Sequence, residues 1–316
     1  MRELYGALYG AAEGVAEALI AALVVLLNLL PAPLAEPFQY GFMQRALLTT
    51  LVVGAVCGVL SCFVVLRRWA LLGDAISHAV LPGVAVAYLL AWPYFVGAFV
   101  TGALTALGIG FIERHTRIKE DTAMGLMFTG AFALGVVMIS RIATATHLMH
   151  ILFGNVLGVR MPVLLLTLLA GAATLLAVFL FYKELSLYIF DPTQASAVGI
   201  NTAAVHYGLM LLLTLTIVAS LETVGVILVV AMLITPGATA YLLSNNLPRM
   251  MLLAAGVGMV SGVVGLYLSF YLNVASGGTI VLVASGLFVL ALIFAPHGLV
   301  SRWRRGRLGA SRYGDA

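Results

Sequence analysis

The feature that most constrains this chain is a series of apolar runs, each about as long as a bilayer-crossing helix, which needs about 20 residues. The runs lie at 43–66, 71–91, 94–112, 122–140, 161–182, 204–220, 223–243, 249–272 and 277–298. Only 9% of the 316 residues are charged, whereas about a quarter of a soluble domain is charged. We therefore predict an all-α polytopic membrane protein with nine spans.

The segment before these runs predicts a tenth span. Its apolar part, Ala18–Leu30, is preceded by Glu13 and Glu17 and is followed by Pro31 and Pro33. We predict a span from about residue 8 to residue 30, and an interfacial helix is the alternative.

The distribution of positive charge predicts the orientation, because cytoplasmic loops of membrane proteins carry an excess of Lys and Arg. If Arg67 and Arg68 face the cytoplasm, twelve cations lie inside, and Arg45, Arg141 and Arg160 lie outside. The C-terminus is then cytoplasmic. This rule also explains the net charge of +4, so that no nucleic-acid partner is needed.

One run contains an acidic residue and a histidine among apolar side chains. Asp74 and His78 lie four residues apart in LLGDAISHAVLPG, so they share one face of a helix. An aspartate in the middle of a bilayer costs about 2.5–3.5 kcal/mol, which a bound cation would offset. One oxygen and one nitrogen ligand suit Mn²⁺, Fe²⁺ or Zn²⁺. The alternative is that Asp74 pairs with Arg67 or Arg68 and that the histidine is simply packed.

Two Pro-Gly pairs lie within apolar runs of opposite direction, at Pro82–Gly83 and Pro236–Gly237. Proline removes a helical hydrogen bond and permits a kink, and pairs of broken helices flank the binding sites of many transporters. We predict that these four residues belong to a gate or to the transport pathway.

Other polar residues are weaker candidates for the pathway. Glu222 is expected at an outer turn between two runs, where it lines an entry path or is merely solvated. His147 and His150 lie in a segment too short to span, predicted to be a short outer or re-entrant helix, and they contact incoming metal or are interfacial. His206 is expected to be a surface or capping residue near a cytoplasmic end.

The connection between the fifth and sixth runs carries the signals of a separate short helix, over about 192–198. Asp191 is a good N-cap and Gly199 a good terminator, while proline at the first position and glutamine at the third complete the pattern. This helix is either interfacial or a docking surface for a cytoplasmic partner. The residues concerned are Asp191, Pro192, Thr193, Gln194, Ala195 and Gly199.

ATP binding by this chain is not expected. Neither Lys119 nor Lys183, the two lysines, follows the Gly-x-x-x-x-Gly frame of a P-loop. If ATP powers transport, another polypeptide hydrolyses it, and this chain is not itself an enzyme.

Several long motifs, in order, resemble one transporter family. They are YGFMQRALLTTLVVGAVCGVLSCFVVLRRWALLGDAISHAVLPGVAVAYLL, HILFGNVLGV, VGVILVVAMLITPGATAYLL and FAPHGLV. They closely resemble the permeases of ABC importers for zinc, manganese and iron. The likeness covers residues 38–300, leaving an N-terminal extension at 1–37 and a basic tail at 301–316. GDAISHAVLPG and LITPGATAYLL look most like manganese/iron permeases, with zinc as a further possibility.

The resemblance implies a type II ABC importer fold in the bacterial inner membrane. It implies a homodimer of permeases, two cytoplasmic ATP-binding subunits, and a periplasmic or lipid-anchored metal-binding protein. Asp74 and His78 match the family's GD-x-x-x-H motif, which is taken to coordinate metal. Asp191–Gly199 would be the coupling helix, and His147–Val159 would belong to the gating region. No permanently bound cofactor is implied, since the ion is cargo.

Two other classes remain open. An ion-coupled secondary metal transporter would need no ATPase partner, although few acidic residues lie within the runs. A membrane enzyme would need a catalytic group such as paired aspartates, yet Asp74 is the only aspartate in a predicted span and no HExxH occurs.

Overall fold

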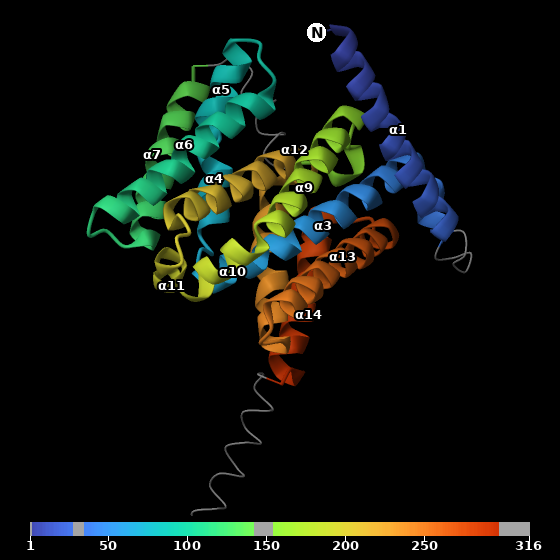
Figure 1. Ribbon diagram of the computed structural model, residues 1–316. Helices are drawn as coiled ribbons and strands as arrows, with labels where there is room; N and C mark the ends of the chain where they lie inside the picture. Colours follow the sequence, from blue (N-terminus) through green and yellow to red (C-terminus); the bar gives the residue numbers. More distant parts are fainter. Residues whose placement is uncertain (1, 28–34, 142–153, 297–316) are drawn as a thin grey trace, which may run out of the picture.

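The computed structural model describes residues 2–27, 35–141 and 154–296, and within these ranges every regular element is a helix (Figure 1). Among the described residues, eight helical segments are long and apolar enough to cross a membrane, with α4 and α5 together counted as one. The α-helices are α1 (Arg2–Leu27), α3 (Gly41–Arg67), α4 (Leu72–Ala79), α5 (Leu81–Leu89), α6 (Tyr94–His115), α7 (Glu120–Ile139), α9 (Met161–Leu180), α10 (Tyr182–Phe190), α11 (Pro192–Ala197), α12 (Thr202–Leu243), α13 (Leu247–Leu272) and α14 (Ser276–Phe294). Two 3₁₀ turns, η1 (Glu36–Gln39) and η2 (Val156–Gly158), complete the set.

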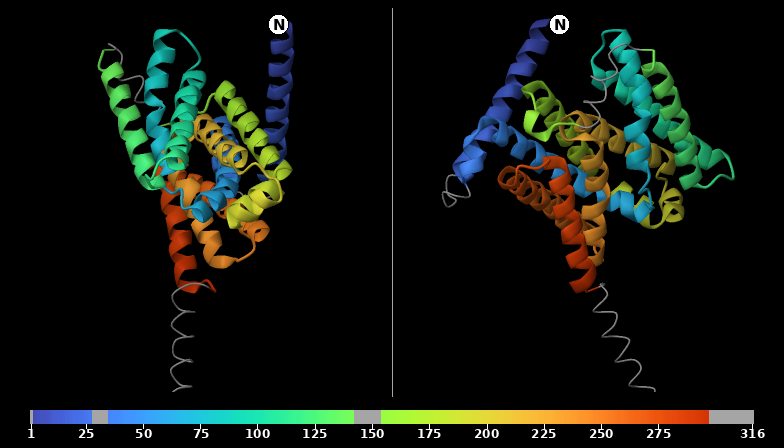
Figure 2. Two further views of the ribbon diagram at one scale, coloured as in Figure 1. Left: turned by 60° about the vertical axis from the view of Figure 1, so that its left-hand side comes forward. Right: turned by 180° about the vertical axis from the view of Figure 1, so that it is seen from behind.

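The sixth and seventh predicted spans are the two legs of α12. A straight helix of its 42 residues would be about 63 Å long, twice the hydrocarbon thickness of about 30 Å. The backbone turns at Gly225, with φ 80° and ψ 166°, a conformation that is accessible essentially only to glycine. The two legs run in clearly different directions (Figures 1 and 2). The nine predicted spans therefore correspond to eight helical segments in the described ranges, because the sixth and seventh are joined in α12.

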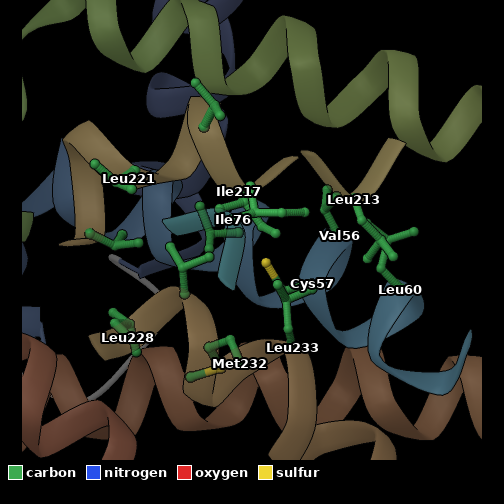
Figure 3. Close-up of a cluster of buried hydrophobic side chains, with 14 of the residues drawn as sticks. Val56, Cys57, Leu60, Ile76, Leu213, Ile217, Leu221, Leu228, Met232 and Leu233 are labelled. Carbon is green, nitrogen blue, oxygen red and sulfur yellow. The ribbon is translucent and has the colours of Figure 1, made fainter. Parts of the chain in front are cut away.

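The core lies where α3, α4 and both legs of α12 meet (Figure 3). Side chains from all four segments interdigitate there, which brings residues more than 150 positions apart into contact. Those labelled in Figure 3 are Val56, Cys57, Leu60, Ile76, Leu213, Ile217, Leu221, Leu228, Met232 and Leu233. The second leg of α12 also packs against α14.

Facing glycines bring α3 and α13 into close contact. Gly54 and Gly58 form one GxxxG motif and Gly258 and Gly262 another. A Cβ at Gly54 would lie 2.7 Å from the Gly258 carbonyl carbon and one at Gly58 would lie 2.5 Å from the Ala254 oxygen. Because helices surrounded by lipid have no hydrophobic driving force to associate, van der Waals packing at such close backbone contacts stabilises the pair.

The break expected at Pro82–Gly83 is present, because α4 ends at Ala79 and α5 begins at Leu81. Proline cannot donate to the carbonyl four residues before it, that of His78. A Cβ on Gly83 would collide with the Gly97 oxygen, so this glycine lets α5 approach α6.

At the second Pro-Gly pair the helix does not break. α12 stays helical through Pro236, and the one non-helical residue within it is Gly225. A Cβ on Gly237 would lie 2.5 Å from the backbone of Ser61, so Gly237 serves the contact with α3. Pro236 and Gly237 are both buried, and packing against neighbouring helices lets a membrane helix tolerate the missing hydrogen bond.

The ends of the chain and the connections also differ in part from expectation. In α1, Ala16 is buried and Ile20 packs against a small cluster that includes Leu48 of α3 and Leu164 of α9. That α1 crosses the membrane stays a prediction. The loop predicted at 183–203 contains α10 before the short helix α11. Of the predicted outer helix, residues 154–159 contain only the turn η2, and His147 and His150 lie outside the described residues.

Candidate metal site

The short helix α4 places Asp74 in its first turn and His78 in its last turn. Nε2 of His78 lies 3.4 Å from Oδ1 of Asp74, and the side chains are 32% and 49% exposed, respectively. Ala75, Ile76 and the rest of the opposite face are buried. As the four-residue spacing predicts, the carboxylate and the imidazole lie side by side on the exposed face of α4.

The alternative pairing of Asp74 with an arginine is not observed. The Arg67 guanidinium instead lies over the rings of Tyr188, at 4.6 Å, and Trp69, at 5.5 Å. In the described part of the chain, the ion-pair partner of Asp74 is His78.

Asp74 and His78 border a cavity of about 690 Å³ between α4, α5, α7, α12 and α14. Its other walls are almost entirely apolar: Leu81, Phe132, Val136, Ile139, Ser140, Val226, Ile227, Val230, Ala231 and Val281. Phe128 and Phe132 each pack 5.5 Å from the His78 ring and hold it in place. The pair is therefore the main polar feature of an otherwise apolar cavity.

The geometry of the pair permits a shared metal ion. Two ligand atoms that are each about 2.1 Å from one ion can be at most about 4.2 Å apart, and the observed separation of 3.4 Å lies inside that limit. No group of three or more His, Cys, Asp or Glu side chains gathers anywhere among the described residues. Among the described residues, Asp74 and His78 are thus the two charged or imidazole ligands that one chain offers an ion here.

Other predicted pathway residues lie apart from this pair. Pro82 and Gly83 are buried in α5 next to the cavity wall at Leu81. Pro236 and Gly237 lie further along α12 than Ala231, the last α12 residue of the wall, and the contact of Gly237 is with α3.

Glu222 lies three residues before the turn of α12. Its Oε1 is 3.4 Å from Nη2 of Arg160, which is 79% exposed, and both residues line a separate cavity of about 310 Å³. The expected position of Glu222 at a turn between two spans is confirmed. Its ion pair with Arg160 was not expected from the sequence.

The cap signals of the short helix α11 are confirmed. Oδ1 of Asp191 accepts a hydrogen bond from the Gln194 N–H at 2.8 Å, and Pro192 opens the helix. Gly199 follows with φ 94°, which lets the Ile200 N–H reach the Ala195 carbonyl at 3.0 Å. Thr193, at the second position of this helix, is exposed.

His206 is not the surface residue that its place in the sequence suggests. It is 1% exposed and lies beside Trp69, Glu113 and Tyr188, which come from three other segments of the chain. No local signal marks this cluster, because its members are far apart in sequence and meet only when the helices pack.

Known proteins place the chain in a family. It is 54% identical to the manganese transport system membrane protein MntC of Halalkalibacterium halodurans over 85% of this chain and 92% of that protein. It is 49% identical to the chelated iron transport system membrane protein YfeD of Yersinia pestis over 83% of this chain and 88% of that protein.

A solved structure gives the same fold. PsaBC from Streptococcus pneumoniae in complex with Fab matches with a TM-score of 0.74 and 45% identity, covering 82% of this chain and 93% of that chain. The transmembrane fold is that of the type II ABC importers. A model of the ABC 3 transport family matches residues 39–295, and the chain belongs to this family of membrane permease subunits.

Proposed function

We propose that this permease imports a divalent transition-metal ion, manganese in the first place and iron or zinc in the second. The observation that carries the proposal is the Asp74–His78 pair, which faces a cavity of about 690 Å³ with apolar walls. A carboxylate in such surroundings is costly, and a cation with affinity for oxygen and nitrogen offsets that cost. The names of the relatives, which refer to manganese and to chelated iron, support the same cargo.

The permease works with partner chains in this proposal. A homodimer sits in the bacterial inner membrane with its C-termini in the cytoplasm, and two ATP-binding subunits dock beneath it. A periplasmic or lipid-anchored binding protein delivers the ion from the other side. The capped helix α11, from Pro192 to Ala197, is the docking element for the ATP-binding subunit.

Transport follows alternating access. The ion enters the cavity from the outside and is held by Asp74 and His78. Two copies of the pair, one from each permease, provide two carboxylates, whose charge balances that of a doubly charged ion. Closure of the ATP-binding subunits moves α11 and opens the cavity inward. The site must hold the ion weakly, because conduction requires release as well as binding.

The test is uptake of radioactive Mn²⁺ by vesicles or cells that contain the complete transporter. We expect Asp74→Asn and His78→Ala each to lower uptake about tenfold or more, since a lost contact to a charged group is worth about 1.5–3 kcal/mol. The control is His115→Ala, which removes an exposed histidine at the end of α6.

Uptake at the wild-type rate by both site variants, at equal protein levels, would remove the pair from the mechanism. Uptake that continues when ATP hydrolysis is blocked would instead favour an ion-coupled carrier. Competition by unlabelled Mn²⁺, Fe²⁺ and Zn²⁺ ranks the cargo.

A further inference from the structure

A partly buried polar cluster that the metal site does not use lies where the ends of α3, α6, α7, α10 and α12 meet. We define it by its six residues: Arg67, Trp69, Glu113, Glu120, Tyr188 and His206. Five of them carry a buried nitrogen or oxygen that makes no hydrogen bond of ordinary geometry among the described residues: Arg67, Trp69, Glu113, Glu120 and His206. Buried polar groups are normally paired, so this concentration of incompletely paired groups needs an explanation.

His206 is the centre of this cluster. Its Nδ1 lies 2.8 Å from the Tyr188 hydroxyl, and its ring meets the Trp69 ring edge-on at 5.3 Å. Burial raises the pKa of the Tyr188 phenol, so the hydroxyl stays protonated and can donate to Nδ1. The neutral imidazole then carries its proton on Nε2, which faces Glu113.

The contact between His206 and Glu113 is incomplete. Nε2 lies 3.5 Å from Oε2 of Glu113, and neither atom has another hydrogen-bond partner in the described structure. A normal N–H···O bond measures about 2.9 Å, so a relative movement of about half an ångström between α6 and α12 would form it.

The cluster joins the proposed docking helix to the helix that carries the metal ligands. Tyr188 lies three residues before Asp191, the N-cap of α11. Trp69 lies three residues before the start of α4, and its carbonyl accepts a hydrogen bond from the Leu72 N–H at 3.0 Å. The Arg67 guanidinium lies over the rings of both Tyr188 and Trp69. A shift of α10 and α11 therefore reaches the base of α4 through side chains in direct contact.

We propose that His206 is a positioning residue that couples the α10–α11 segment, through Tyr188, to Trp69 and Glu113 and so to the ligand-bearing helix α4. This inference rests on the proposed function, because it assumes that the ATP-binding subunit moves α11. His206 does not touch the metal. Its task is to convert that movement into a shift of α4.

The test compares Tyr188→Phe and His206→Asn with wild type in vesicles that contain the permease with its ATP-binding subunit and binding protein. Two rates are measured, Mn²⁺ uptake and ATP hydrolysis. We expect hydrolysis to persist and the number of ions per ATP to fall about fivefold, as the loss of one buried hydrogen bond predicts. The matched control is Tyr182→Phe, which removes a hydroxyl from the same helix outside the cluster.

The double variant tests whether Tyr188 acts through His206. If Tyr188 acts through His206, Tyr188→Phe in the His206→Asn background has no further effect on ions per ATP. Wild-type ions per ATP in Tyr188→Phe would overturn the inference, as would loss of assembly in that variant, since the role would then be purely structural. If the wild-type complex itself takes up no Mn²⁺ with ATP, the proposed function fails rather than the inference alone.

Discussion

Gly225 sets the direction of the second leg of α12. Its φ of 80° and ψ of 166° exclude a Cβ without strain, and Gly154 packs directly onto its backbone. We expect Gly225→Ala to lower the free energy of unfolding by about 1–3 kcal/mol. The measurement is the thermal unfolding midpoint of the purified protein in detergent.

The control for this substitution is Gly208→Ala in the first leg of the same helix. A Cβ at Gly208 meets nothing within 4 Å, and alanine is the better helix former. We expect an unchanged or slightly raised midpoint for Gly208→Ala. An equal midpoint for both variants would show that the turn of α12 does not depend on the glycine conformation.

The helix α11 depends on its cap, because six residues are too few for a stable isolated helix. Asp191→Ala removes the acceptor of the Gln194 N–H, at a cost of about 1 kcal/mol. If α11 is the docking element, we expect binding protein to stimulate ATP hydrolysis less in this variant, and Mn²⁺ uptake to fall with it.

Asp191→Asn is the matched control, since asparagine caps a helix about as well as aspartate does. We expect it to retain stimulation close to wild type. Equal loss in both variants would assign the effect to the charge of Asp191, and no loss in either would contradict the docking role of α11.

The complete transporter is expected to contain two permeases that share one ion. A single chain supplies two side-chain ligands at the cavity, and no larger ligand group occurs in the described ranges. We therefore expect the site to bind one Mn²⁺ for every two permease chains. Native mass spectrometry and elemental analysis of the purified complex measure this ratio, and one ion per single chain would contradict the shared site.

Much of this architecture could be predicted from short-range patterns. Apolar runs of about 20 residues located the eight described helices that are long and apolar enough to cross a membrane, since a bilayer imposes one length on any helix that crosses it. The four-residue spacing of Asp74 and His78 put them on one helix face, and the Asp191–Pro192 signals located α11. In each case the determining interaction lies within one or two helical turns.

Predictions failed where the outcome depends on packing between distant segments. Pro236–Gly237 was expected to permit a kink, yet α12 stays helical there and Gly237 packs against Ser61 of α3. His206 was expected at the surface and is buried between α3, α6 and α10. Nothing within a few residues of these positions carries that information.

The chain's own residue order determined the membrane environment, the positions of the spans, the side-by-side placement of the carboxylate and the imidazole, and the cap of α11. Hydropathy and helical periodicity act locally, so a single sequence is enough to read them. Only the tertiary structure decided that the pair borders a cavity, that Gly237 faces Ser61, and that His206 joins α10 to the base of α4. Those features arise from contacts between helices, and such contacts exist only after the whole chain has packed.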